Sequence, residues 1–371
     1  MHFESVQLIQ FRNYARAEVP LAPGLCLLLG DNGQGKTNFL EAVYLLGNLR
    51  SFRTHRLEQL IRWSTPGAEA HGALATPAGR ETLSVHLTAE SRRVLLDGRP
   101  VGRATEFIRR TRVIAFSPDD LFLLRDHSEE RRRFLDRALF HVRPAYGEAL
   151  TEYGRALRQR NALLRALRER PAPDSLRQMD IWDEMMARWG AEIRRARSEY
   201  LDALSETAGH RWRELSGRSS TVRLVPVETG AGADSARLLE TLQHRRAVDL
   251  SRGFTTCGPH RDDMEWSVDD RPARETLSQG QFRLFVLALK LAEAEMHTKI
   301  TGTRPILLFD DVAAELDRAH RDRLGGCLAD SSQGQVLATS CENAGWPRAA
   351  GRVFIHAGSA SGSPSMAVGG R

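Results

Sequence analysis

Two short motifs that lie far apart in the sequence have to meet in space, and this constrains the fold more than any other feature. GDNGQGKT, residues 30–37, follows the apolar run LCLLL and precedes the helix-like segment NFLEAVYLLGNL. It matches G-x-x-x-x-G-K-[ST], a loop whose backbone N–H groups surround a phosphate at a helix N-terminus. RPILLFDD, residues 304–311, reads as a short buried strand that ends in Asp310 and Asp311. Because 274 positions separate Lys36 from Asp310, a large insertion must interrupt one phosphate-binding core.

The residue types in these motifs predict a nucleoside triphosphate site with Mg²⁺. Lys36 would reach the β- and γ-phosphates, and Thr37 would ligate Mg²⁺. Asp310 would hold the metal's ligand shell, while Asp311 would orient or deprotonate the attacking water. The alternatives are a chance glycine-rich turn and a strand that ends at a solvated acidic turn. The residues predicted to bind the cofactor around the loop are Gly30, Asn32, Gly33, Gln34, Gly35, Lys36, Thr37 and Asn38.

A third motif, LSQGQ at residues 277–281, stands between the other two and opens the segment FRLFVLALKLAEAEM. That segment is apolar on nearly all sides, which is typical of a buried helix. A Ser hydroxyl and Gly amides at a helix N-terminus would form a second anion site. Alone, LSQGQ could be no more than a Ser N-cap, but its place in this order of motifs favours the anion site.

Taken together, the motifs resemble the ABC-type ATPases of the SMC group, and within it the RecF family of bacterial recombination mediators. The resemblance covers nearly the whole chain, through LIQFRNY, RSFRTHR, AFSPDDL, CGPHRDD, LLFDDVAAELD and QVLATS. It implies an α/β fold: an ABC-type ATPase head of two lobes, with a P-loop core and an antiparallel β subdomain, plus an inserted α-helical hairpin. It also implies a weak, dimer- and DNA-dependent ATPase of DNA replication, recombinational repair and the SOS response, with ATP and Mg²⁺ as cofactors.

In ABC ATPases two heads dimerise face to face, and each nucleotide lies between one P-loop and the partner's signature motif. Carried over to this chain, Lys36 and Asp311 act in cis and Ser278 acts in trans, and these three are the implied catalytic residues. Gly280 and Gln281 would accompany Ser278 at the γ-phosphate. Hydrolysis would remove the bridging phosphate and release the pair.

The resemblance gives three further segments a role near the nucleotide. Arg12 and Asn13, in FRNY, match the position that touches the α-phosphate and ribose, although a surface salt bridge is the alternative for Arg12. Ala314–Asp317 matches the D-loop, which crosses the dimer interface. Arginines also stand where SMC-like heads sense DNA and ATP, with a solvated loop as the alternative; these are Arg50, Arg53 and Arg56.

The chain departs from the usual ABC pattern at two places. Ser340 and Cys341 stand where many ABC ATPases have a switch His, so Thr339 or Ser340 would contact the γ-phosphate more weakly, consistent with slow turnover. The glutamine of the usual Q-loop is not evident, and Asp119 or Asp120 would take its place in linking the nucleotide to the arm.

The patterns along the chain predict four parts: ATPase head lobe I at residues 1–118, a helical arm at 119–216, head lobe II at 217–356 and a disordered tail at 357–371. Lobe I has alternating segments with turn signals, which is typical of antiparallel hairpins. The arm has two long segments of helical spacing around a Pro-Ala-Pro break, which predicts an antiparallel helical hairpin. Its arginines are interleaved with acids, as on a solvated helical face. His260 in lobe II has no nucleophile pattern around it, which favours a structural or interface role.

Charge, cysteines and hydropathy bound the partners and the compartment. A formal net charge of +6 and a pI near 9.5 favour a polyanion partner, although abundant arginine is also typical of a GC-rich genome. The four cysteines are scattered, which indicates reduced thiols rather than a metal site. No apolar run approaches the ~20 residues of a membrane span and no signal pattern is present, so we expect a cytoplasmic protein without a membrane partner. The resemblance implies sequence-independent binding to double-stranded and gapped DNA, action with RecR and RecO, and an ATP-dependent homodimer.

Other classes of protein explain less of the sequence. The nucleotide-binding subunit of another ABC system, such as a transporter, predicts a clear Q-loop and usually a switch His. A P-loop small-molecule kinase does not explain LSQGQ or the long insertion. A scaffold with an inactive ATP site is disfavoured because Lys36, Thr37, Asp310 and Asp311 are all present.

Overall fold

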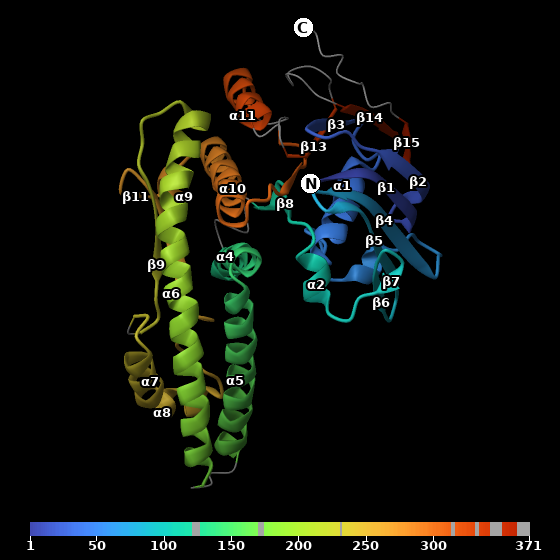
Figure 1. The fold of residues 1–371 in the computed structure, drawn as a ribbon. Coiled ribbons are helices and arrows are strands. Elements are labelled where there is room, and N and C mark those ends of the chain that lie inside the picture. Colours follow the sequence, from blue (N-terminus) through green and yellow to red (C-terminus); the bar gives the residue numbers. More distant parts are fainter. Residues whose placement is uncertain are drawn as a thin grey trace. The chain divides into compact units, whose positions relative to one another are not determined.

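The structure is a computed structural model that describes residues 1–120, 127–169, 174–230, 232–312, 316–330, 334–341 and 351–361. It divides into two compact units (Figure 1). We call the first the head unit, which contains residues 1–122, 211–219 and 278–371. The second, the arm unit, contains residues 123–210 and 220–277. The head unit is therefore assembled from three separate stretches of sequence, as the distance between the phosphate-loop and acidic motifs requires.

One sheet of the head unit is antiparallel, with strand order β2-β1-β4-β5-β6-β7. The bounds are β1 His2–Phe11, β2 Tyr14–Pro20, β4 Gly67–Thr76, β5 Gly79–Thr88, β6 Arg92–Leu96 and β7 Arg99–Pro100. The last two strands are joined by Asp97 and Gly98, both with positive φ, which is the turn that the Asp-Gly pair predicts. The antiparallel β subdomain expected from the sequence is confirmed.

The other sheet of the head unit has the order β15-β14-β3-β13-β12-β8. The bounds are β3 Leu25–Leu29, β8 Val113–Phe116, β12 Ile306–Phe309, β13 Val336–Ser340, β14 Gly351–His356 and β15 Ser359–Ser361. The five strands from β14 to β8 run parallel, and only β15 is antiparallel to its neighbour. Because carboxyl ends of parallel strands meet at one sheet edge, the phosphate loop after β3 and the acidic pair after β12 lie at the same edge.

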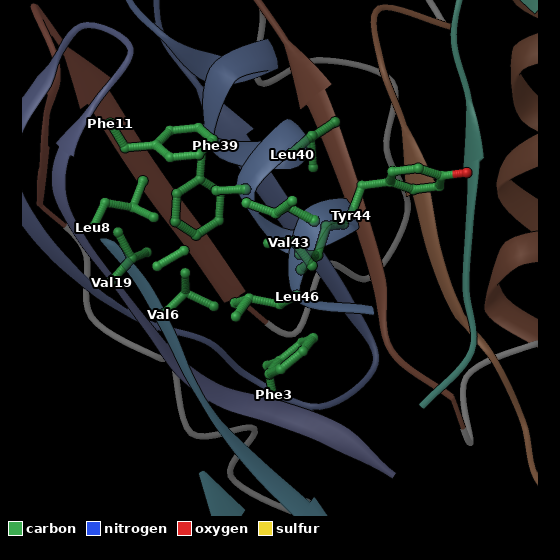
Figure 2. Packing of buried hydrophobic residues seen from close by; sticks show 14 of the residues in the cluster. Phe3, Val6, Leu8, Phe11, Val19, Phe39, Leu40, Val43, Tyr44 and Leu46 are labelled. Carbon is green, nitrogen blue, oxygen red and sulfur yellow. The ribbon is translucent and has the colours of Figure 1, made fainter. Parts of the chain in front are cut away.

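Helix α1 (Lys36–Asn48) fills the space between these sheets and is buried along nearly its whole length. Figure 2 shows Phe39 and Val43 of this helix packing against Val6, Leu8 and Phe11 of β1. The other helical elements of the head unit are α2 (Ala104–Ile108), α10 (Gln279–Thr301), α11 (Arg318–Asp330) and the short 3₁₀ turn η1 (Leu57–Leu60). Burial of apolar side chains on all sides of α1 fixes the position of the phosphate loop at its N-terminus.

The arm unit is built on a pair of long helices, α5 (Pro144–Glu169) and α6 (Asp174–Ser216), although residues 211–216 of α6 belong to the head unit. Arg143 next to α5 pairs with Glu199, whereas Leu164 near its far end packs with Met179, so the two helices are antiparallel. At 1.5 Å per residue they are about 39 and 65 Å long. The remaining elements are α4 (Ser128–Val142), α7 (Ser235–His244), α8 (Arg246–Arg252), α9 (Ala273–Thr276), β9 (Val222–Val227), β10 (Asp263–Val268) and β11 (Arg271–Pro272). The predicted helical hairpin is confirmed.

Several arginines of the arm are buried, which corrects the expectation of a solvated charged face. Arg160 is fully buried and donates to Asp183 at 2.6 Å and to Asp249 at 2.7 Å. Arg194 is 1% exposed and forms a bidentate pair with Asp262. Alternating charge predicts solvation only when the partner acids lie on the same surface, whereas here they come from separate elements and close over the guanidinium groups.

Replacing Arg160 with leucine should lower the free energy of unfolding by about 3–5 kcal/mol, because the buried carboxylates of Asp183 and Asp249 would lose a shared cation. Urea titration followed by circular dichroism measures this. Arg155→Leu is the matched control, since Arg155 is exposed on the same helix and should change stability by no more than about 0.5 kcal/mol. Equal midpoints for the two variants would contradict a stabilising role for the buried cluster.

The four-part division of the chain stays a prediction, and the described residues add two facts to it. Residues 220–277, expected in lobe II, lie in the arm unit, because β9 and β10 pair with each other and β10 packs on α4. The segment 359–361, expected in the tail, forms β15 through a turn at Ala357 and Gly358, both with positive φ. Within the described part, no helix is both long and apolar enough to cross a membrane.

Candidate nucleotide-binding site

The phosphate loop between β3 and α1 can be formed only by the glycines it contains. Gly30, Gly33 and Gly35 all have positive φ, at 152°, 79° and 119°. A Cβ on Gly30 would lie 2.2 Å from the carbonyl oxygen of Ile355, and one on Gly35 would lie 2.7 Å from Nδ2 of Asn13. The loop is thus closely surrounded by other backbone and side chains, and a larger residue at Gly30 or Gly35 would not fit.

Lys36 lies against this loop and is 8% exposed. Its Nζ donates to the carbonyl oxygens of Gly30 at 2.6 Å and Asp31 at 2.9 Å, and lies 3.6 Å from Sγ of Cys341. A phosphate oxygen is a stronger acceptor for an ammonium than either a carbonyl or a thiol. The arrangement therefore fits a phosphate-binding lysine at the position that the sequence predicts.

The predicted metal ligands Thr37 and Asp310 are brought together. Thr37 Oγ1 donates to Asp310 Oδ1 at 2.9 Å, and Thr339 Oγ1 donates to the same oxygen at 3.0 Å. Burial raises the pKa of the Asp310 carboxyl, and the two hydroxyl hydrogen bonds oppose that rise. Mg²⁺ takes hard oxygen ligands about 2.1 Å away, which places neighbouring ligands about 3.0 Å apart. The Thr37 and Asp310 oxygens fit that ion, and its charge would favour the ionised carboxylate.

Asp311 follows in an unusual backbone conformation. Its φ is 50°, its side chain is exposed, and its amide donates to Thr339 Oγ1 at 2.7 Å. A left-handed conformation in a residue other than glycine stores strain, and such strain is concentrated at functional sites. The hydroxyl of Thr339 thus joins both acidic residues to β13, a role that the sequence did not reveal because Thr339 lies 28 positions after Asp311.

Arg12 is held by a buried carboxylate. Its guanidinium forms a bidentate pair with Glu41 of α1, at 2.9 and 2.8 Å, and Glu41 is fully buried. Arg53 Nη1 lies 3.7 Å from the same carboxylate and donates to Asn38 at 3.1 Å. The salt bridge considered for Arg12 is therefore present, with a buried partner. Arg50 and Arg56 are exposed.

Asn13 and Tyr14 hold the outer part of the loop from the β1–β2 turn. Asn13 Nδ2 donates to the carbonyl of Gln34 at 3.0 Å, and its Oδ1 accepts from Asn38 at 2.8 Å. The buried hydroxyl of Tyr14 donates to the carbonyl of Gly35 at 3.0 Å. Sequence reasoning singled out Asn13 and missed Tyr14, although both belong to the FRNY motif.

The turn between β14 and β15 holds the same part of the loop from another side. The amide of Gly358 donates to the carbonyl of Gln34 at 3.0 Å, and the amide of Ala357 donates to its side-chain oxygen. Backbone amides carry no sequence signal, so this support could not be predicted. The predicted cofactor residue Gln34 acts here as the point where the loop is tied to the rest of the sheet.

Cys341, at the place of the missing switch His, is exposed and donates from its thiol to Oδ1 of Asn32 at 2.9 Å. It also contacts Lys36, as described above. Of the two residues predicted to contact the γ-phosphate, Thr339 has its hydroxyl engaged by the acidic pair. Cys341 is therefore a side chain at the end of β13 that touches two residues of the phosphate loop.

The signature residues lie at the N-terminus of α10, where Ser278 and Gly280 are exposed and Gln281 is partly buried. Ser278 Oγ accepts from the amide of Gln281 at 3.3 Å, and Gln281 Oε1 accepts from the amide of Ser278 at 3.0 Å, which is a capping box. A Cβ on Gly280 would meet nothing within 4 Å. Across the residues that the structure covers, no hydrogen bond joins Ser278 or Gln281 to the phosphate loop of the same chain. The Ser278 hydroxyl proton remains able to donate to a phosphate oxygen.

Three other predicted residues fall into different settings. Asp120 accepts from the amide of Ser117 at 2.8 Å and lies 3.6 Å from Nζ of Lys290 on α10, while Asp119 is exposed. His260 is partly buried, accepts from the Tyr153 hydroxyl at 2.7 Å, and has its pKa lowered by desolvation to about 4, which favours the structural role. Of the predicted D-loop, Ala314 and Glu315 lie outside the described residues.

Known proteins resemble this chain in sequence and in fold. The sequence profile described as RecF/RecN/SMC N terminal domain matches residues 2–356. The DNA replication and repair protein RecF of Acidothermus cellulolyticus is 37% identical over 350 residues, which cover 92% of this chain and 94% of that protein. The protein of the same description in Gloeobacter violaceus is 37% identical over 378 residues, covering 99% of this chain and 100% of that one. A solved structure of the recombination mediator RecF with ATP, from the RecFOR pathway, matches with a TM-score of 0.89 at 25% identity, covering 98% of this chain and 97% of that chain.

Proposed function

The chain belongs to the RecF family of SMC-like, ABC-type ATPases, and on that premise we propose that it forms an ATP-bound dimer that binds duplex DNA near gaps in recombinational repair. In this proposal the dimer helps RecO and RecR to load recombinase on single strands, and slow ATP hydrolysis resets it. Mg²⁺, held by Thr37 and Asp310, would neutralise charge on the phosphates.

The observation that carries the proposal is the division of the phosphate-binding groups between two places. At one sheet edge, Lys36 bonds to the phosphate loop through Gly30, and Thr37 bonds to Asp310. Ser278 caps an exposed helix end, where its side chain accepts from the amide of Gln281 and its amide donates to the Gln281 side chain. A 23-residue helix directs its positive N-terminal end outward there, which favours an anion supplied by another copy of the chain. Neither half alone surrounds a triphosphate, so ATP would hold two chains together.

DNA binding in this proposal rests on exposed cations. The buried arginines of the arm unit, such as Arg160 and Arg194, are neutralised by carboxylates and would contribute little to phosphate binding. The chain nevertheless carries a formal charge of +6, and exposed arginines such as Arg50, Arg56 and Arg155 remain to contact a backbone. Such contacts are independent of base sequence and weaken steeply with salt.

Fluorescence anisotropy with a gapped duplex tests this function. The chain should bind more tightly with ATP than with ADP or no nucleotide, equally well for two unrelated sequences, and the logarithm of its affinity should fall linearly with the logarithm of the salt concentration. Affinity that is the same in all three nucleotide states would contradict an ATP-gated clamp.

Asp311→Asn should bind ATP and dimerise but hydrolyse ATP about 100-fold more slowly or worse, because a general base typically contributes 10²–10⁴-fold. The variant would accumulate as the closed dimer on DNA. Phosphate release and light scattering measure the two effects. Asp322→Asn, which changes an exposed carboxylate on α11, is the matched control and should turn over normally. Equal turnover in both variants would mean that Asp311 is not the base.

A further inference from the structure

Two histidines and a glutamate meet on the antiparallel sheet of the head unit. Glu69 and His71 lie two positions apart on β4, and His86 is the direct cross-strand neighbour of Glu69 on β5. Side chains two positions apart on a strand share a face, so all three stand on one face of the sheet. Their neighbours on the other face, including Ala70 and Val85, are buried in the core beside α1.

The ligand atoms of this cluster are already close together. One oxygen or ring nitrogen from each of Glu69, His71 and His86 lies within 4.8 Å of the others. His71 Nε2 is 3.0 Å from one Glu69 oxygen, and His86 Nδ1 is 3.6 Å from the other. A tetrahedral Zn²⁺ with ligands about 2.0–2.2 Å away places them about 3.4 Å apart, which lies between these two distances. The spacing between Glu69 and each histidine is thus already near the one that this ion imposes.

A hydrogen bond to Ser84 holds the ring of His71 in place, as hydrogen bonds to the second ring nitrogen do for histidines that bind metals. His71 Nδ1 lies 2.9 Å from the hydroxyl of Ser84, its cross-strand neighbour, which is itself buried. If His71 Nδ1 donates to Ser84, the lone pair of His71 Nε2 points toward Glu69. A cation between that nitrogen and the Glu69 carboxylate would bind both. The strands that carry the set lie in the middle of a six-stranded sheet, so the backbone holds the three side chains in place.

Charged groups of both signs lie around the Glu69, His71 and His86 cluster. His86 Nδ1 lies on the side of its ring that faces the Glu69 carboxylate, 3.6 Å away. Arg93, opposite His86 on β6, is exposed and opposes a cation, while the carboxylate of Glu69 favours one. Imidazole and carboxylate ligands together suit Zn²⁺ and its neighbours Co²⁺ and Ni²⁺ better than Mg²⁺.

We propose that Glu69, His71 and His86 form a binding site for one divalent transition metal ion, with Zn²⁺ as the best fit, that fastens β4 to β5. The site is separate from the Mg²⁺ site of the nucleotide and does not depend on the proposed function. A bound ion would stabilise the folded head unit in proportion to its concentration and affinity.

Metal-free full-length chain, without nucleotide, would be titrated with Zn²⁺ by calorimetry and with Co²⁺ by visible absorption. We expect one ion per chain, Co²⁺ bands of nitrogen and oxygen ligation, and a melting temperature that rises with Zn²⁺. His71→Ala and His86→Ala should lose this binding. Ser84→Ala should weaken it about 10-fold, because it removes the hydrogen bond that orients the His71 ring.

Two controls separate this site from others. His244→Ala removes an exposed histidine that also faces a glutamate but has no second histidine, and it should bind as the wild type does. Cys341→Ser removes the exposed thiol, and it too should bind normally. Either no saturable binding in the wild type, or binding retained by His71→Ala and His86→Ala, would overturn the proposal. Thiolate charge-transfer bands that vanish in Cys341→Ser would overturn it as well.

Discussion

The Ser278→Arg variant is expected to bind ATP as a monomer and to fail to dimerise under conditions in which the wild type forms an ATP-bound pair. Ser278 is exposed at the N-terminus of α10, and its bonds are made within its own capping box. A long cation at that place would fill the space meant for the partner's nucleotide, while leaving Lys36 and Asp310 untouched. The expected loss is of the dimer itself, and with it of nearly all hydrolysis.

Light scattering with no nucleotide, ADP and ATP measures the molar mass of wild type and variant. Ser278→Ala is the matched control, because it removes the cap, at a cost of about 1 kcal/mol to the helix, and the hydroxyl donor, but adds no bulk and no charge. It should dimerise more weakly than the wild type but still visibly. Fluorescent ATP should bind all three proteins, because the phosphate loop is unchanged in each. A normal ATP dimer of Ser278→Arg would refute a nucleotide site shared between two chains. The phosphate loop alone would then remain as the proposed ATP site.

Lys36→Met should weaken ATP binding by about 100-fold or more, and dimerisation should disappear with it. The ammonium is replaced by an apolar side chain of similar length, so charge-assisted hydrogen bonds to phosphate, each worth about 1.5–3 kcal/mol, are lost. In the structure Nζ bonds to two carbonyls of the loop, so the loop also loses two internal contacts.

Equilibrium binding of a fluorescent ATP analogue measures the affinity, and circular dichroism shows whether the variant is folded. Lys36→Arg separates charge from geometry, because it keeps the cation but cannot reproduce the compact ammonium. It should bind less tightly than the wild type and more tightly than Lys36→Met. Tight ATP binding by Lys36→Met would overturn the assignment of Lys36 as the phosphate ligand.

The main parts of the fold followed from patterns that are local in sequence. β3 and β12 are short apolar runs with clear ends, and α10 is apolar on all sides behind a Ser cap, so each could be located to within a few residues. The partners of these elements could not be found in the same way. Thr339 and the Ala357–Gly358 turn serve the site through contacts across 28 and more than 300 positions. Such contacts depend on strand order, which the pattern of one strand does not contain.

The arginines of the arm show a second limit of sequence reasoning. A helix with alternating Arg and acidic residues looks the same whether its charges face water or the charges of another element. Only the packing of α8 and the 255–263 segment on α5 and α6 buries Arg160 and Arg194 with their acids. The Glu69, His71 and His86 cluster is similar, because its two strands must be placed in register before the third ligand joins the first two.

The strand order of the parallel sheet has a consequence for the synthesis of the chain. β3 is made among the first 30 residues, yet both strands that pair with it, β13 and β14, follow residue 335. At about 5–20 residues per second, the ribosome needs roughly 15–60 s to supply them. During that time a fully apolar strand has neither of its neighbours, and closing a loop of more than 300 residues is slow. Nascent chains therefore acquire a phosphate loop of native shape only when translation is nearly finished, and until then β3 needs protection from aggregation.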